Sequence, residues 1–224
     1  MSNACFNNRM ATDRDHHKAD GRRVAGAETR RRLLAAAADL LAEGGEHGVT
    51  LRAVSRAAGA NVAAIQYHFG SREALIAEVV GEAARHVITA QLTALEALSR
   101  RKRRPTAAEW VESWATPLIR VATGRTAEER RLGRIVGQTF AAPFERLDVQ
   151  LRELTTQPTE QLIDALDRTL PSVERPEIVL RVALMASSLA GFASGAFEPW
   201  LAGAEPSRDI ERRLLARMTR IATG

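Results

Sequence analysis

Cysteine, aromatic residues and long uncharged stretches are all scarce in this sequence. Cys5 is the single cysteine, which excludes an intrachain disulfide and fits a reducing, cytoplasmic setting. Aromatic residues account for 4% of the 224 residues, and with alanine and arginine abundant this composition favours helices over a β-sandwich. The longest uncharged stretch, 182–197, is too short and too weakly apolar to span a bilayer, and residues 1–26 lack the apolar core of a signal sequence. We therefore expect a soluble protein without a membrane partner.

Patterns typical of catalysis and metal binding are missing as well. The sequence has no glycine-rich phosphate-binding loop and no nucleophile with a plausible neighbouring base. His16 and His17 stand together without a further histidine or cysteine at ligand spacing, which favours a solvated pair over a metal site. We expect no enzyme activity, no cofactor and no metal. The formal charge of +5 is compatible with a polyanionic partner but does not by itself indicate one.

Apolar residues recur at three- and four-residue intervals from Glu28 onward, which predicts an all-α fold. Residues 1–26 show no such period, so we expect a flexible tail there. Gly44 and Gly45 end the first helix, and the five adjacent cations of Arg100–Arg104 before Pro105 indicate a loop. We predict an N-terminal three-helix helix-turn-helix domain over 27–86 and a larger C-terminal helical domain over 87–224. Beyond a long helix beginning at Ser71, further helices are expected over 106–121, 126–140, 144–154, 160–170, 177–197 and 207–222.

The segment Thr50–Arg72 is the most informative part of the chain. It predicts two short helices hinged at Gly59, with Thr50 and Asn61 as their N-caps. Small residues around the hinge permit close contact between the two helices. The residues of these helices that are expected to face the core are Leu51, Val54, Ala58, Val62 and Ile65.

The opposite face of the second helix is unusual for a solvated surface, which normally carries lysine and glutamate. Its residues are Ala63, Ala64, Gln66 and Tyr67. Short side chains suit the floor of a DNA major groove, where alanine can touch a thymine methyl and Gln66 can form paired hydrogen bonds with adenine. Phosphate contacts are expected from Tyr67, His68, Arg72 and the amide groups at the helix starts.

The order of these residues resembles the DNA-binding domain of the TetR family over about residues 27–86. A helix is followed by Thr50-Leu51-Arg52, by Ala-Gly before the turn, and then by Tyr67-His68-Phe69, Ser71-Arg72-Glu73 and Leu75. The resemblance implies that Thr50 caps a helix and binds phosphate, and that Arg52 stands where some members read a base. It also implies that Arg72 binds phosphate where a lysine is commoner, which keeps the charge but changes the geometry. Phe69 is expected in the core, and Tyr67 either in the core or on DNA. The implied DNA-binding residues are Thr50, Arg52, Asn61, Ala63, Ala64, Gln66, Tyr67, His68 and Arg72.

A single helix-turn-helix binds DNA weakly, so we expect a homodimer on a palindromic operator. The last two helices are the best candidates for a two-fold four-helix interface, because their small residues permit close approach, while Leu180 and Leu184 add apolar area. Ordinary intrachain core is the alternative. The predicted dimer-interface residues are Ala183, Ala186, Ser187, Ala190, Gly191, Ser194, Leu214 and Met218.

The C-terminal domain also carries aromatic and polar residues that predict a ligand cavity, although each could equally fill the core. Residues 131–140 and 170–191 are similar to the branch of the TetR family that includes fatty-acid-responsive regulators, which implies a fatty acid or acyl effector. His86 is a further polar candidate. The predicted ligand-binding residues are Trp110, Trp114, Arg134, Gln138, Phe140, Phe144 and Met185.

Together these patterns predict a sequence-specific transcriptional repressor, released from double-stranded operator DNA when a small, largely apolar effector binds. The long helix beginning at Ser71 is the expected route of coupling, which in regulators of this kind amounts to roughly 1–3 kcal/mol. The alternative is a basic helical interaction protein or membrane-surface protein without operator specificity, which would use Arg100–Arg104 to bind acidic lipids or partners. That basic run is most simply a solvated loop.

Overall fold

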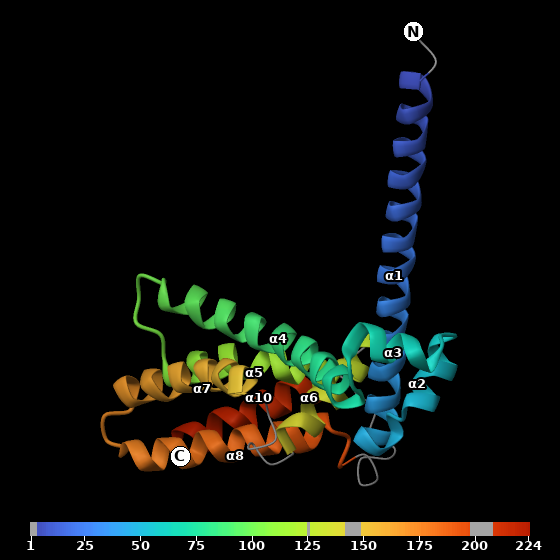
Figure 1. Ribbon diagram of the computed structural model, residues 1–224. Coiled ribbons are helices and arrows are strands. Elements are labelled where there is room, and N and C mark those ends of the chain that lie inside the picture. The colour runs from blue at the N-terminus through green and yellow to red at the C-terminus, as the bar shows by residue number, and fades with distance from the viewer. Residues whose placement is uncertain (1–3, 125, 142–148, 198–207) are drawn as a thin grey trace. The chain divides into compact units, whose positions relative to one another are not determined.

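The chain folds into helices joined by loops (Figure 1). The computed structural model describes residues 4–124, 126–141, 149–197 and 208–224, with side chains described over 24–124, 126–139, 152–153, 156–197 and 210–224. No strand occurs in these ranges, and the predicted all-α fold is confirmed.

The fold divides into two compact units, Met1–Ile76 and Ala77–Gly224. The division falls inside the long helix α4 (Arg72–Ser99), earlier than the boundary that the sequence predicts after residue 86. Unit 1 holds the start of α4 together with α1 (Ala4–Gly48), α2 (Leu51–Ala58) and α3 (Val62–Phe69). Unit 2 holds the rest of α4 together with α5 (Ala107–Ala122), α6 (Ala127–Ala141), α7 (Val149–Thr169), α8 (Arg175–Ala193) and α10 (Arg208–Thr223).

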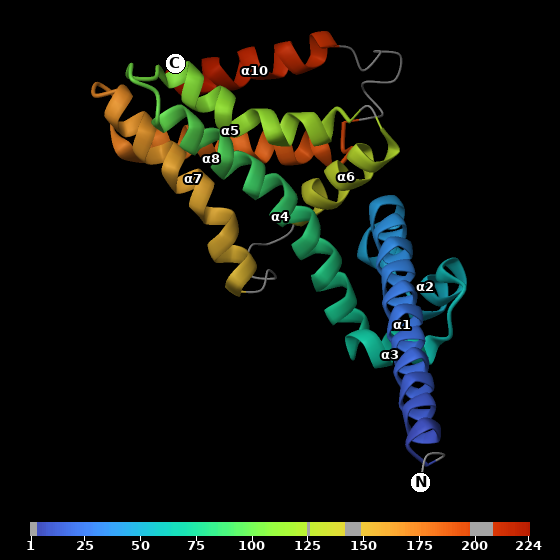
Figure 2. The same ribbon diagram turned by 90° about the horizontal axis from the view of Figure 1, so that it is seen from above.

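Helix α1 is longer than the sequence predicts. Its backbone is helical from Ala4 and extends well past α2 and α3 (Figures 1 and 2), where a tail over residues 1–26 was expected. Alanine, arginine and methionine all favour helix, so backbone of this kind forms without an apolar stripe; the mobility of this stretch stays a prediction. Gly45, at φ 62° and ψ −165°, interrupts the helical conformation, as the Gly44-Gly45 pair predicts.

A small apolar core joins the helices of unit 1. Leu33 of α1, Val54 of α2 and Ile65 of α3 are each at most 1% exposed, which confirms the core positions predicted for the last two. Leu51 and Val62 were also predicted to face this core and do not, since they are 37% and 40% exposed. Each is the first residue of its helix, where the chain has just left the surface at an exposed N-cap.

Helix α5 is the central helix of unit 2 and contacts α6, α7, α8 and α10 (Figure 2). Apolar side chains on several of its sides are therefore buried. They are Trp110, Val111, Trp114, Ala115, Leu118, Ile119 and Val121.

Two glycines allow α6 to approach its neighbours at backbone distance. A Cβ atom at Gly133 would lie 2.2 Å from the carbonyl oxygen of Val121 in α5, and one at Gly137 would lie 2.2 Å from the backbone nitrogen of Ser194 at the end of α8. Backbone atoms cannot move aside as a flexible side chain can. The two glycines thus fix how α6 packs against α5 and α8.

Helix α7 is a single helix, whereas the sequence predicts two, over 144–154 and 160–170. It runs through Pro158, which lacks the N–H for a bond to the carbonyl four residues earlier and whose ring crowds that carbonyl. Pro158, Leu162, Ala165 and Leu166 form one buried stripe at helical spacing. Packing of this stripe in unit 2, where α7 contacts α5 and α8, offsets the lost hydrogen bond.

Helix α8 is, among the described helices, the one whose length and composition would allow a membrane crossing. Its contacts with α5, α6, α7 and α10 explain the same composition by packing within a bundle. Arg181 also attaches α8 to α10, because its Nη1 donates to the Ala222 carbonyl at 3.1 Å. Its Nε donates to Glu177 Oε1 within α8 at 2.7 Å.

Candidate functional site

The two short helices of unit 1 both begin at an exposed side-chain cap, as predicted. The Thr50 hydroxyl accepts a hydrogen bond from Ala53 N at 3.1 Å, and Asn61 Oδ1 accepts one from Ala63 N at 3.0 Å. Each cap satisfies one amide of the first turn, so the remaining amides can bind an external anion such as a DNA phosphate.

The turn between α2 and α3 is fixed by glycine and by a serine. Gly59 adopts φ 58° and ψ 39°, the left-handed conformation that ends a helix with little strain only at glycine. Ala60 N donates to the Ser55 carbonyl at 3.0 Å, while the Ser55 hydroxyl donates to the Ala60 carbonyl. This pair holds α3 in a defined direction relative to α2.

Helix α3 exposes most of the residues that were predicted to read DNA. Tyr67 is 85% exposed and therefore does not lie in the core, and Ala63 and Gln66 are also exposed. Ala64 and His68 are half-buried. The remaining aromatic residue, Phe69, is half-buried rather than fully in the core.

Two further features extend the candidate interface. Val62, exposed at the start of α3, is an apolar residue that the sequence placed in the core; its position directly after an Asn cap was the available signal. Arg30 covers the Phe69 ring at 5.0 Å, a cation–π contact at the end of α3.

The electrostatics of this face favour a polyanion. The sequence contains no aspartate or glutamate between Gly48 and Arg72, whereas Arg52 and Arg56 are both exposed on α2. A cationic surface attracts phosphates, and their counterions are released on binding.

Arg72 is more than the phosphate-binding residue that the resemblance implies. Its guanidinium donates to the backbone carbonyls of Glu46 and Val49, at the end of α1 and just beyond it, and lies 3.3 Å from Glu73 Oε1. Carbonyls at a helix C-terminus lack helical donors, so a planar guanidinium that reaches two of them joins the start of α4 to α1. Arg72 therefore has a structural role within unit 1.

We predict that Arg72→Ala destabilises unit 1 by about 1–3 kcal/mol, because it removes two charge-assisted hydrogen bonds. Arg72→Lys should keep the charge and still lose stability, since an ammonium cannot make the same paired contact. Chemical unfolding and operator titration measure the two effects separately. Arg52→Ala is the matched control, expected to weaken DNA binding at unchanged stability. Equal stability of Arg72→Ala and wild type would show that the backbone contacts contribute nothing.

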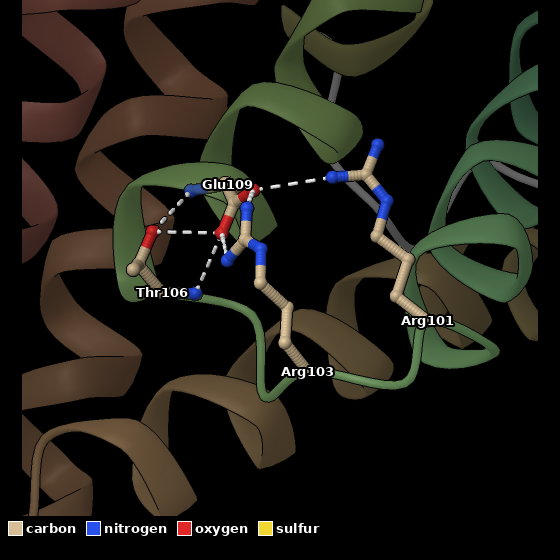
Figure 3. Close-up of polar contacts among 4 residues, drawn as sticks. All are labelled: Arg101, Arg103, Thr106 and Glu109. Atoms are coloured by element: carbon tan, nitrogen blue, oxygen red, sulfur yellow. Dashed lines mark hydrogen bonds and ion pairs between the residues drawn. The ribbon is translucent and has the colours of Figure 1, made fainter.

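The basic loop, Arg100–Arg104, folds back onto the first turn of α5 (Figure 3). Glu109 accepts from Arg101 at 3.2 Å and from Arg103 at 2.9 Å, and it forms a capping box with Thr106. The Arg103 guanidinium and the Thr106 amide lower the pKa of Glu109 to about 2. The ion pair thus contributes fully above the ordinary carboxyl pKa and is lost only as the pH falls towards 2. Arg100 separately pairs with Glu96 at 2.6 Å.

The predicted ligand-binding residues fall on α5, α6 and α8, which contact one another. Trp110, Trp114 and Met185 are buried, and Arg134 and Gln138 are half-buried. The side chain of Phe140 and the whole of Phe144 lie outside the described residues. Over the described part of the chain, no group of three His, Cys, Asp or Glu side chains could hold a metal ion.

Gln91 is a buried polar residue that the sequence patterns did not single out. It is 6% exposed on α4, and its Nε2 donates to the Trp114 carbonyl at 2.8 Å, which joins α4 to α5. The signal was its spacing, since Gln91 continues the buried row of Ile88 and Leu95. His86 lies on the other side of α4, in an exposed groove of about 750 Å³, and so does not point into the interior of unit 2.

The predicted dimer residues divide into an exposed and a buried group. Ala183 and Ser187 are exposed, and Ala186, Gly191, Ser194 and Leu214 are half-buried. Ala190 and Met218 are each 3% exposed, so they belong to the core of unit 2 and not to its surface. The exposed side of α8 carries instead Val179, Leu180 and Leu184, which are 44%, 54% and 52% exposed.

Known protein families match both units. Residues 33–79 match the family described as "Bacterial regulatory proteins, tetR family", and residues 112–224 match "Tetracyclin repressor-like, C-terminal domain". The first match spans the capped helices and turn of unit 1. A comparison with curated proteins finds no match.

Solved structures of similar fold are also regulators. The TetR family regulator PfmR from Thermus thermophilus is 21% identical, covers 86% of this chain and 98% of its own, and has a TM-score of 0.58. A transcriptional regulator from Rhodococcus sp. Rha1 is 24% identical, with coverages of 86% and 95% and a TM-score of 0.54. The regulator FadR from Bacillus subtilis, solved in complex with stearoyl-CoA, is 12% identical, with coverages of 84% and 97% and a TM-score of 0.55.

The family matches cover more than half of the chain and include the residues that build the exposed reading face of α3. The chain belongs to the TetR family and is a DNA-binding transcriptional regulator.

Proposed function

We propose that this regulator is a homodimeric cytoplasmic repressor of a palindromic operator and is released by a small, largely apolar effector. The observation that carries the proposal is the exposed face of α3. Ala63, Gln66 and Tyr67 are exposed there, on the helix whose N-terminus Asn61 caps and in a stretch without acidic residues. Such a face fits the major groove, where short side chains permit close approach and Gln66 can pair with adenine.

The dimer proposal is supported by the exposed side of α8. Val179, Leu180 and Leu184 are three large apolar residues at helical spacing, and Ala183 and Ser187 between and beyond them are small. Exposed apolar rows of this kind mark association sites. A second copy of the chain is the proposed occupant, because one reading head contacts only one half-site and a two-fold partner supplies the other.

The effector proposal rests on the interior of unit 2. Trp110, Trp114 and Met185 come from helices that contact one another and are apolar, and FadR, a structural neighbour, was solved with stearoyl-CoA. We propose a fatty acid or acyl compound as the ligand. The effector acts by binding the released conformation more tightly than the DNA-bound one, and α4, which begins in unit 1 and continues into unit 2, carries the change.

Selection of bound sequences from a random duplex pool tests the DNA-binding part of this proposal. Wild-type protein should enrich a palindrome, with affinity falling steeply as salt rises. Gln66→Ala is expected to lose preference at one base pair of each half-site, at a cost of about 1–3 kcal/mol there, while other positions keep theirs. Gln161→Ala, on the exposed surface of α7, is the control. Sequence-independent binding, together with binding to anionic vesicles, would favour a membrane-surface protein using Arg100–Arg104.

A further inference from the structure

The indole nitrogen of Trp114 is a buried hydrogen-bond donor with no partner among the described residues. Trp114 is 3% exposed and sits on α5, the central helix of unit 2. Tryptophan usually finds an acceptor for this N–H when it is buried, because a donor removed from water and left unpaired is costly. Phenylalanine would fill much of the same space without that cost. The unpaired donor therefore calls for an acceptor from outside the chain.

The neighbours of Trp114 on its own helix offer no acceptor for the indole N–H. The backbone carbonyl of Trp114 accepts a hydrogen bond from Gln91 Nε2 at 2.8 Å, which fixes α4 against this turn of α5. Its neighbours one turn away on α5, Trp110 and Leu118, are buried, and neither side chain carries a hydrogen-bond acceptor. The hydrogen bond from Gln91 thus fixes the backbone that carries the indole, while the side-chain donor has no partner among the described residues.

The lack of charged groups in the described interior favours an uncharged acceptor over a carboxylate. Among the described residues of the whole chain, the fully buried polar ones are Gln91 and Thr139, and neither is charged. The half-buried arginines described in unit 2 already interact with other groups of the chain; they are Arg131, Arg134, Arg152 and Arg181. A carboxylate brought to Trp114 would lose water without gaining a free buried cation, which is strongly unfavourable. An uncharged carbonyl oxygen loses far less.

We infer that Trp114 Nε1 donates a hydrogen bond to the uncharged carbonyl oxygen of an otherwise apolar effector, an ester or thioester in preference to a free acid. This inference rests on the proposed effector response of unit 2 and goes beyond it by naming the donor and the acceptor. The donor positions the carbonyl, and the apolar side chains of the core bind the hydrocarbon part.

Three probes test the inference: methyl decanoate, sodium decanoate and 1-chlorodecane, which share one hydrocarbon chain and differ in the acceptor. Protein labelled with ¹⁵N in its tryptophans gives a separate indole N–H signal for Trp110, Trp114 and Trp200. Methyl decanoate is expected to move the Trp114 signal downfield, as a new hydrogen bond does, and 1-chlorodecane to bind without that shift. Assignment uses Trp114→Phe, or Trp110→Phe and Trp200→Phe by elimination if Trp114→Phe does not fold.

A double-mutant-type cycle compares the affinities of wild type and Trp114→Phe for methyl decanoate and for 1-chlorodecane. Trp114→Phe should weaken methyl decanoate roughly 2- to 12-fold more than it weakens 1-chlorodecane, the range expected for one ordinary hydrogen bond. Any effect of the smaller ring on the shape of the site is common to both ligands and cancels. Operator release by each probe is followed in the same samples.

The outcomes separate this inference from the proposed function. Release from the operator by methyl decanoate at equal potency in wild type and Trp114→Phe, with no shift of the Trp114 signal, keeps the effector response and overturns the role of Trp114. If decanoate binds more tightly than methyl decanoate, the inference that the acceptor is uncharged is wrong. Failure of all three probes to bind overturns the inference and the apolar effector together, while leaving operator binding as a separate result.

Discussion

Replacing Leu184 with glutamate should convert the proposed dimer into monomers. Binding to a palindromic operator should weaken at least about a hundredfold, which is less than the usual difference between specific and non-specific affinity. Leu184 is 52% exposed at the C-terminal end of the apolar row on α8, next to Leu180 and Ala183. In a two-fold interface each substitution occurs twice. Two carboxylates would then be desolvated close together without a cation, which costs several kcal/mol in an apolar contact.

Sedimentation equilibrium and fluorescence anisotropy with labelled operator measure the two effects. Leu184→Glu should retain weak binding to a single half-site, because unit 1 and its reading face are unchanged. Thr93→Glu, which adds the same charge to an exposed position of α4, is the control and should remain a dimer with wild-type affinity. A dimeric Leu184→Glu with unchanged operator affinity would place the interface elsewhere.

The contrast between α3 and α8 shows which kinds of feature can be predicted from sequence. In α3 the caps, the hinge glycine and the exposed residues are all local, so Thr50, Asn61 and Gly59 could be assigned from neighbouring residues and proved to have the expected geometry. The core positions predicted for Leu51 and Val62 were wrong. Periodicity assigns each residue to a face of its helix but does not show that the first turn lies at the surface.

Helix α8 has apolar or small residues on most of its circumference, so periodicity cannot say which side faces another copy. Small residues suggested a seam that included Ala190, which the fold buries. Leu180 and Leu184, which the sequence also assigned to this seam, are exposed, and Val179 beside them was found only once packing against four other helices was known. The same limit applies to Arg72. Its contacts with carbonyls 23 and 26 positions earlier depend on the tertiary fold, whereas its charge and the family resemblance both indicated a phosphate contact only.

Gly137→Ala is expected to lower the melting temperature, against the usual effect of this substitution in a helix. Alanine is favoured over glycine by about 1 kcal/mol at an ordinary helix position. At Gly137 the added Cβ would stand 2.2 Å from Ser194 N and 2.6 Å from the Ala193 carbonyl carbon, so α6 must shift away from α8. Overpacking of this kind costs about 1–3 kcal/mol, or more when the obstruction is backbone. For a chain of this size that corresponds to a fall of roughly 2–12 °C.

Gly81→Ala in α4 is the matched control, because a Cβ added there would meet a flexible side chain and not backbone. The nearest atoms to a Cβ there belong to the flexible guanidinium of Arg85, at 3.1 Å, which can turn away. Helix propensity then decides, and Gly81→Ala should unfold at the same or a higher temperature than wild type. Helix propensity alone predicts that both substitutions raise the melting temperature. Changes of opposite sign at the two glycines would therefore follow from the atoms that each added Cβ meets. If Gly137→Ala unfolds at a higher temperature, α6 and α8 have room to separate, and the close contact between them does not fix the shape of the interior.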